Sequence, residues 1–358
     1  MKRRHFLMAA GLAPAGMLLP KQLFANATPA ANKSWRIFET TTSVEVLNPV
    51  GPTKVWLPLP LINDTNYQKS LGNQWNAEGG KVQVANNSAQ NAGIVAAEFA
   101  EGTRPLLKLK SRFATMDRST DFGAPRVETV EELSRFLKST DLKPTDGIVK
   151  TTADKITQGV SGDVEKARAI YNWIVDNTFR DPKTRGCGLG DIKYMLETNS
   201  MGGKCADINA LFVALARASG IPARDVYGVR VADSNNGYKS LGKSGTITKA
   251  QHCRAEFYAA GLGWIPVDPA DVRKVMLEEE GGLPATHEKV IAARKFLFGN
   301  WEMNWLAYNN AYDVKLPGSD KKPIGFLMYP QCETAEGRRD CLDPDAFKYE
   351  MTSREIIV

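Results

Sequence analysis

Apolar and polar residues alternate along short runs in the first third of the chain, between residues 35 and 118. Alternation with a period of two is the pattern of a strand that has one buried face. Clusters of Asn, Gly and Pro separate the runs, as turns would. We therefore predict a small β-sandwich over residues 35–118, followed by a connector with one helix over residues 119–150.

A different pattern begins near residue 150, where we place a second domain over residues 151–358. Strand-like runs at residues 251–258 and 264–268 are separated by a glycine-containing turn. Two earlier segments have apolar residues at the spacing of one buried helical face: Val164, Ala167, Tyr171 and Ile174, and then Ile208, Leu211, Phe212 and Leu215.

The second of these helices is predicted to begin at Cys205, directly after Gly202 and Gly203, and to end at Gly220. A thiol on the first turn of a helix meets unpaired backbone N–H groups and the positive end of the helix dipole. Both favour its thiolate form, which is the nucleophile that acyl transfer from an amide needs. Cys205 is therefore a candidate nucleophile.

Histidine is scarce, and among the three in the chain His252 is the best candidate base because it begins a predicted strand. Asp268 ends the next strand. A three-residue turn over residues 260–262 would place Asp268 diagonal to His252, about 7–8 Å away at Cα. Glu256 is the rival carboxylate, but four residues along a strand is roughly 13 Å. The pattern favours Asp268 as the residue that orients His252.

Residues 163–274 resemble the core of the transglutaminase-like superfamily of cysteine enzymes. The resemblance implies a papain-like α+β core, with helices packed on an antiparallel sheet, and a catalytic set of Cys205, His252 and Asp268. It rests on blocks in the expected order: Ala169–Ile174, Gly190–Asp191, Gly203–Asp207, Ala214–Arg224, Val226–Gly228, His252, Glu256, Tyr258 and Gly263–Pro269.

This set of residues predicts cysteine-dependent acyl transfer on peptide or protein amide bonds through a thioester. Water as acceptor would make the protein a peptidase or amidase, which we favour, and an amine would make it a transglutaminase. The alternative is a non-catalytic secreted peptide-binding or scaffold module on the same fold. Arg254 stands where the family usually carries an aromatic residue. It could receive a substrate carboxylate, or stack and form a salt bridge near the surface.

The N-terminus is typical of an export signal. Residues 2–7 resemble a twin-arginine motif, a short and broken apolar stretch follows, and Ala25-Asn26-Ala27 fits a cleavage site. We therefore expect residues 1–27 to direct the protein to the periplasm or out of the cell, with no stable membrane span. These residues also carry much of the net charge of +6. Without a basic helix or tail in the rest, nucleic acid is not expected as a partner.

Export would place the five cysteines in an oxidising compartment. Cys332 and Cys341 flank a polar loop and are predicted to form a disulfide. Cys187 and Cys253 either form a second bridge or are buried and reduced. If both bridges form, Cys205 remains as the free thiol. A zinc site is not expected because there is no Cys-x-x-Cys pair, and the sequence indicates no other metal or cofactor.

Overall fold

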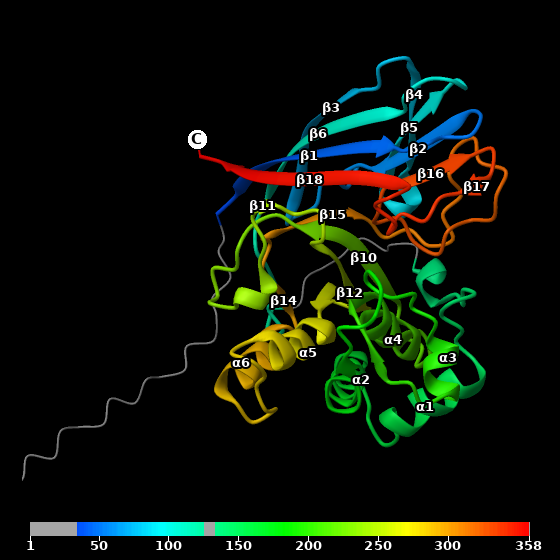
Figure 1. Cartoon of the computed structure of the whole chain (residues 1–358). Coiled ribbons are helices and arrows are strands. Elements are labelled where there is room, and N and C mark those ends of the chain that lie inside the picture. Colours follow the sequence, from blue (N-terminus) through cyan, green and yellow to red (C-terminus); the bar gives the residue numbers. More distant parts are fainter. Residues whose placement is uncertain (1–33, 125–132, 358) are drawn as a thin grey trace, which may run out of the picture.

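The computed structural model of the protein describes residues 34–124 and 133–357. The predicted export signal lies outside these residues. Two five-stranded sheets face each other at one end of the molecule (Figure 1). One sheet has the order β11 (Gly245–Thr246), β18 (Phe347–Ile356), β1 (Arg36–Val46), β6 (Leu106–Thr115), β3 (Gln68–Asn76). The other has the order β17 (Gly337–Arg338), β16 (Gln331–Thr334), β2 (Thr53–Pro58), β5 (Ala92–Phe99), β4 (Gly80–Asn87).

The two sheets form the predicted β-sandwich. Every strand pair within them is antiparallel, and alternate residues of both sheets enter a shared core. Val44, Leu57, Val95, Leu107 and Phe347 are among the buried residues of that core. The period of two in the first third of the sequence therefore reflects strands with one face in the sandwich.

The predicted domain boundaries need correction because the end of the chain returns to the sandwich. β18 pairs with β1 over ten residues, and β16 pairs with β2. Without β18, the backbone N–H and C=O groups along one side of β1 would form an open sheet edge. The sandwich is thus built from residues 36–115 together with β11 and β16–β18, and residues 151–358 are not one separate domain.

The second part of the molecule is a four-stranded antiparallel sheet with helices packed against it. Its order is β13 (Gly263–Val267), β12 (Gln251–Ala259), β10 (Ala223–Arg230), β15 (Trp305–Asn309). The helices are α1 (Gly147–Thr157), α2 (Asp163–Asn177), α3 (Ile192–Glu197), α4 (Cys205–Ala218), α5 (Pro269–Glu278) and α6 (Glu288–Phe296). This is the predicted α+β core of helices on an antiparallel sheet.

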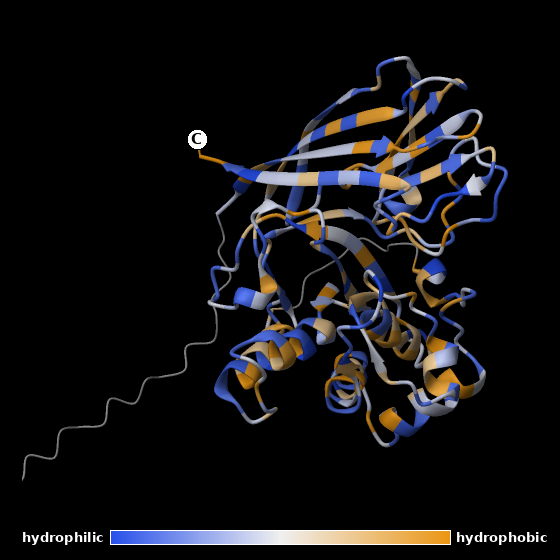
Figure 2. Cartoon of the chain, in the orientation of Figure 1, coloured by the Kyte–Doolittle hydropathy of each residue, from blue (hydrophilic) through white to orange (hydrophobic). Residues whose placement is uncertain are grey.

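Helix α4 lies at the centre of this part and is buried along its whole length. Its residue Phe212 packs against Phe257 of β12, with ring centroids 6.0 Å apart. Figure 2 shows α4 apolar over most of its surface, whereas α1 and α6 mix polar and apolar positions. A helix that is apolar on all sides needs cover on all sides, and the sheet and neighbouring helices supply it.

Short elements complete the fold. β8 (Phe179–Arg180) pairs in parallel with β9 (Gly202–Gly203), and β7 (Arg118–Ser119) pairs with β14 (Asn300–Trp301). Single 3-10 turns span Ser88–Gln90, Ser134–Leu137 and Lys239–Leu241. The described part of the predicted connector helix is only the turn at Ser134–Leu137, since residues 125–132 lie outside the description.

The sandwich and the four-stranded sheet pack directly on each other. Phe38 and Phe113 of the sandwich share an apolar cluster with Val229 of β10 and Leu306 of β15. The side chains in this cluster are almost completely buried. The sandwich therefore covers one end of the sheet that carries the candidate site.

Candidate active site

Cys205 is the first residue of α4, as the sequence predicted, and its side chain is buried. The Asp207 carboxylate fixes this end of the helix. It accepts the N–H of Lys204 at 2.9 Å and the N–H groups of Leu189 and Gly190 at 3.0 and 2.9 Å. The thiol thus lies at a well-held helix N-terminus, where the helix dipole favours a negative charge.

The β12–β13 hairpin has the register that the odd-length turn requires. Ala255 lies opposite Val267, which leaves residues 260–262 as a three-residue loop. Continued by one residue, this register places Asp268 diagonal to His252. The alternation of faces along a strand therefore brings the two side chains to the same side of the sheet.

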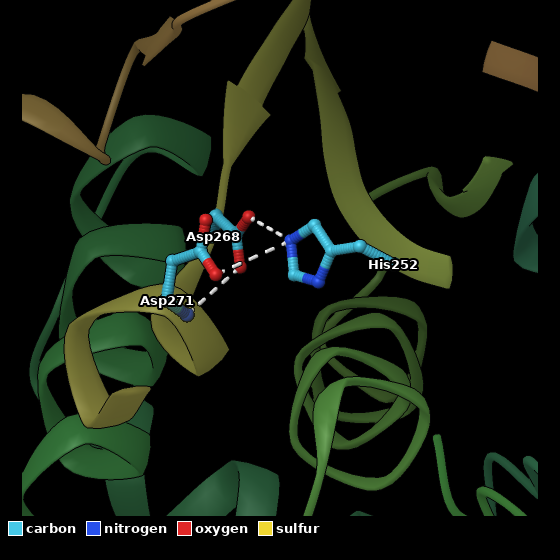
Figure 3. A group of neighbouring side chains, drawn as sticks. All are labelled: His252, Asp268 and Asp271. Carbon is cyan, nitrogen blue, oxygen red and sulfur yellow. Dashed lines mark hydrogen bonds and ion pairs between the residues drawn. The ribbon is translucent and has the colours of Figure 1, made fainter. Parts of the chain in front are cut away.

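His252 lies between two carboxylates on one side and the thiol on the other. Its Nε2 is 2.7 Å from Oδ2 of Asp268 and 3.4 Å from Oδ1 of Asp271 (Figure 3). Figure 3 shows the second ring nitrogen turned away from both carboxylates. Cys205 and His252 line the same pocket, and His252 lowers the pKa of the Cys205 thiol. The structure thus brings the three predicted residues together.

Three side chains that the sequence analysis missed hold this arrangement. Asn209 donates to Oδ1 of Asp268 at 3.1 Å, and the same oxygen accepts the Asp271 N–H at 3.1 Å. Arg230 forms a buried ion pair with Asp271, with Nη2 2.5 Å from Oδ1. Asn209 lies one helical turn after Cys205, so its spacing was a usable signal. Nothing local in the sequence marks Arg230.

The surrounding charges favour a thiolate–imidazolium pair. Hydrogen bonds from the Cys187 and Cys253 thiols, together with His252, hold the pKa of the Cys205 thiol well below its usual range. Burial alone would lower the pKa of His252, but the two neighbouring carboxylates outweigh burial and raise this pKa to about 9. Both shifts favour the charged forms of the two groups, a thiolate and a protonated imidazole.

Arg254 does not point toward a substrate. It is almost completely buried, and its guanidinium lies 4.8 Å from the ring centroid of Trp305. Its Nη1 donates to the Glu302 carbonyl at 2.9 Å, and its Nε lies 3.4 Å from Oδ2 of Asp268. The residue therefore packs behind Asp268 and helps to position it, and the expected role in binding a substrate carboxylate is not supported.

The structure joins none of the five cysteines in a disulfide, so the predicted Cys332–Cys341 bridge does not form. The polar loop between them is a β-hairpin in which Arg339 donates its N–H to the Cys332 carbonyl at 2.9 Å. Cys332 faces the sandwich core, where burial raises its thiol pKa to about 12. Cys341 lies two residues beyond the position paired with Cys332.

The sequence left two alternatives for Cys187 and Cys253, a second disulfide or two buried, reduced thiols. The structure has the second alternative. The neighbouring Cys205 and burial raise the pKa of the Cys187 thiol, and burial and Cys205 raise the pKa of the Cys253 thiol. The Cys187 thiol also donates to the Gln251 carbonyl at 3.3 Å, and the Cys187 carbonyl accepts the Ala206 N–H at 2.9 Å. These contacts place two S–H groups beside the candidate nucleophile.

His252, Asp268 and Asp271 lie close enough together to form a metal-ligand set, with potential ligand atoms within 4.8 Å of one another. However, Asp271 is already paired with Arg230, and the Arg254 guanidinium lies beside Asp268. A cation here would have to compete with two buried guanidinium groups and with a protonated imidazole. The charges favour an ion-pair network at this position rather than a metal site.

A pocket of about 760 Å³ opens in front of the thiol and the imidazole. Cys205 and His252 lie in its wall, and Tyr329, Phe347 and Tyr349 contribute an aromatic side. This volume is within the range of small-molecule and peptide sites. A substrate in the pocket would therefore reach both the nucleophile and the proton donor.

Two sequence comparisons identify relatives of the chain. Residues 150–269 match the family model described as the transglutaminase-like superfamily. An uncharacterized protein of Haemophilus influenzae is 36% identical over 353 residues, covering 92% of this chain and 94% of that protein. The matched family region contains Cys205, His252 and Asp268.

One solved structure shares the fold of this chain. A protein described as a putative cysteine protease from Cytophaga hutchinsonii superposes with a TM-score of 0.51 at 18% identity, covering 90% of this chain and 98% of its own. The periplasmic domain of TgpA from Pseudomonas aeruginosa gives a TM-score of 0.36 at 14% identity, covering 69% and 93%. With its fold, its matched core and its close Haemophilus relative, this chain belongs to the transglutaminase-like superfamily.

Proposed function

We propose that this protein catalyses cysteine-dependent acyl transfer on peptide or protein amide bonds, with Cys205, His252 and Asp268 as its catalytic set. The observation that carries the proposal is the position of His252. One ring nitrogen is 2.7 Å from the Asp268 carboxylate, and the side chain lines the same pocket as Cys205, whose thiol pKa it lowers. This is the arrangement of nucleophile, base and orienting group that thiol-based acyl transfer uses.

In the first step the Cys205 thiolate attacks the carbonyl carbon of the substrate amide. The Cys205 backbone N–H would stabilise the negative charge that develops on the carbonyl oxygen, because the N–H groups of Lys204 and Ala206 already bond Asp207 and the Cys187 carbonyl. His252 then gives its proton to the leaving nitrogen as the C–N bond breaks, which releases the amine and leaves a thioester on Cys205.

In the second step an acceptor resolves the thioester. Water attacks its carbonyl carbon while His252 takes a proton, the C–S bond breaks, and Cys205 returns as a thiolate beside the released acid. An amine in place of water would give a new amide. We propose hydrolysis as the main reaction, which agrees with the description of the Cytophaga protein of the same fold as a protease.

The test combines labelling with a peptide screen. Iodoacetamide should alkylate Cys205 fastest among the five cysteines at neutral pH, as read by peptide mass. A peptide library, incubated with and without an added primary amine, should show cleavage without amine incorporation. Cys205→Ala should abolish turnover, whereas Cys332→Ala, which removes a thiol of the sandwich core, should retain it. Equal slow labelling and no turnover would favour the non-catalytic binding module.

We also propose that the protein is exported. Among residues 34–124 and 133–357, none of the helices has both the length and the apolar character that a membrane crossing requires. The proposal itself rests on the paired arginines of the N-terminus, Arg3 and Arg4. Replacing both by Lys should retain the protein in the cytoplasm of a bacterial host, as measured by fractionation. Unchanged export of this variant would contradict the twin-arginine route.

A further inference from the structure

The pocket in front of Cys205 is strongly basic. Seven Lys and Arg side chains line it, and no Asp or Glu of the described residues does. This excess does not reflect the composition, because residues 28–358 carry nearly equal numbers of basic and acidic residues. The charge is therefore concentrated at the candidate site by the fold.

Four of the seven cations have carboxylate partners behind the pocket wall. Arg230 pairs with Asp271, Arg185 pairs with Asp340, and Arg180 and Lys274 share Glu278 at 2.5 and 3.6 Å. Four cations thus meet only three carboxylates. One of these carboxylates, Asp271, is also engaged by His252.

The other three cations are Lys204, Lys243 and Lys249, and none of them forms an ion pair with a carboxylate of the described residues. Lys204 directly precedes Cys205, and Lys249 lies three residues before His252. Unpaired positive charge therefore lies in the same pocket lining as the thiol and the imidazole. Because the site also contains a thiolate–imidazolium pair of no net charge, the lining keeps an excess of about four positive charges.

Lys274 shows the effect of gathering many positive charges in one pocket lining. It lies in the pocket wall close to Arg230 and Arg180, and burial together with these two guanidinium groups lowers its pKa. Like charges that are held together with too few counter-ions cost free energy, which a bound anion would recover. The lining also has aromatic and apolar residues, among them Tyr329, Pro344 and Phe347. These residues suit the uncharged parts of a peptide better than they suit a free inorganic anion.

We propose that the pocket binds acidic peptides, and that the substrate carries carboxylates within a few residues of the amide that Cys205 attacks. This inference rests on the proposed function of the same site. The carboxylates come from Asp or Glu side chains or from a free C-terminus, which share the same chemistry. Lys243 and Lys249, exposed at the rim, attract the substrate, while Lys204 and Lys274 contact it inside.

The first experiment needs no substrate. Cys205 is alkylated with iodoacetate, which is an anion, and with iodoacetamide, which is neutral and nearly the same size. For Cys205, we expect the ratio of the iodoacetate rate to the iodoacetamide rate to exceed the same ratio for glutathione by about tenfold or more at low salt. This ratio should fall as salt is added. Lys243→Gln and Lys249→Gln should each lower the ratio by about threefold, because each removes one charge from the rim. Lys81→Gln, on the exposed strand β4, is the matched control and should leave it unchanged.

The second experiment uses peptide pairs that differ only in charge: Glu against Gln beside the cleaved amide, and a free against an amidated C-terminus. The acidic member should have the higher kcat/KM, and the two pairs show which carboxylate is recognised. The inference would be overturned by a ratio of iodoacetate to iodoacetamide rates at or below that of glutathione, or by equal cleavage of acidic and neutral peptides. Either result would leave the proposed function intact. A Cys205 that reacts with neither reagent and cleaves neither peptide would instead overturn the proposed function.

Discussion

The side-chain amide of Asn209 donates a hydrogen bond of 3.1 Å to Oδ1 of Asp268. Asn209 lies one turn after Cys205 on α4, and it also donates to the Cys253 carbonyl at 2.8 Å. One buried helix therefore carries the proposed nucleophile and also orients the carboxylate that holds the imidazole. Any movement of α4 relative to the β12–β13 hairpin would disturb both at once.

Replacing Asn209 by Ala should lower kcat by about 10- to 100-fold, because a small misplacement of Asp268 and His252 is costly in a pre-organised site. The side chain is fully buried, and the change leaves polar groups unpaired, so the free energy of unfolding should fall by about 1–3 kcal/mol. Peptide cleavage and thermal unfolding measure the two effects. Asn177→Ala, at an exposed helix end, is the control. A lower Tm with unchanged kcat would mean that Asn209 has only a structural role.

The alkylation rate of Cys205 should change little between pH 7 and 9. The pKa of this thiol is lowered, so its thiolate persists until the pH falls through that lowered value. An ordinary thiol, with a pKa of about 8.5, becomes steeply more reactive over the same range. Peptide cleavage should decline above about pH 9, where His252 loses the proton that the leaving amine needs. A tenfold rise in alkylation per pH unit from 7 to 8 would contradict the thiolate–imidazolium pair.

Replacing Glu256 by Gln should reduce stability without changing the reactivity of Cys205. Glu256 is fully buried between Arg118 and Arg224, and these two guanidinium groups outweigh burial and lower its pKa. Removing one partner of a buried ion pair costs roughly 3–5 kcal/mol. The measurements are denaturant unfolding and iodoacetamide labelling. A large loss of labelling with normal stability would restore Glu256 as the residue that orients His252.

The pH dependence of the stability of the same variant tests whether the pKa of Glu256 is lowered in the folded state. A carboxylate with a lowered pKa in the folded state stabilises the fold above its unfolded pKa of about 4.3. That stabilisation is lost as the pH falls through the folded-state value. The difference in unfolding free energy between wild type and Glu256→Gln should therefore be constant from pH 7 to about 5 and shrink below it. A difference that grows in acid would contradict the ion-pair assignment.

Replacing Gly188 by Ala should loosen the loop that carries Cys187. Gly188 has a φ of +92°, and a Cβ there would lie 1.8 Å from Oδ2 of Asp207. The substitution would displace the carboxylate that fixes the start of α4, so both Tm and the alkylation rate of Cys205 should fall. Gly159→Ala is the matched control, because its φ is +74° with no atom within 4 Å, and it carries only the left-handed backbone cost of about 1–2 kcal/mol. Equal effects of the two variants would exclude a role for the Asp207 contact.

Local periodicity explains what the sequence could predict. The apolar spacing after Cys205 indicated a helix beginning at that residue, and the structure begins α4 there. The alternation of faces along residues 251–268 required a three-residue turn if Asp268 was to reach His252, and the hairpin has that turn. Both inferences involve residues that are close in the chain, so backbone geometry alone relates their side chains.

Only the tertiary structure decided the contacts between distant segments. β18 pairs with β1 across the whole length of the chain, and the pattern of a strand does not reveal which edge it completes. Arg254 has the charge of a surface residue, but Trp305 and the Glu302 carbonyl allow it to be buried behind Asp268. The sequence by itself therefore determined the helix that begins at Cys205 and the hairpin that carries His252, together with the proposal that these residues are nucleophile and base. The charges around them depended on long-range packing, which no local spacing encodes.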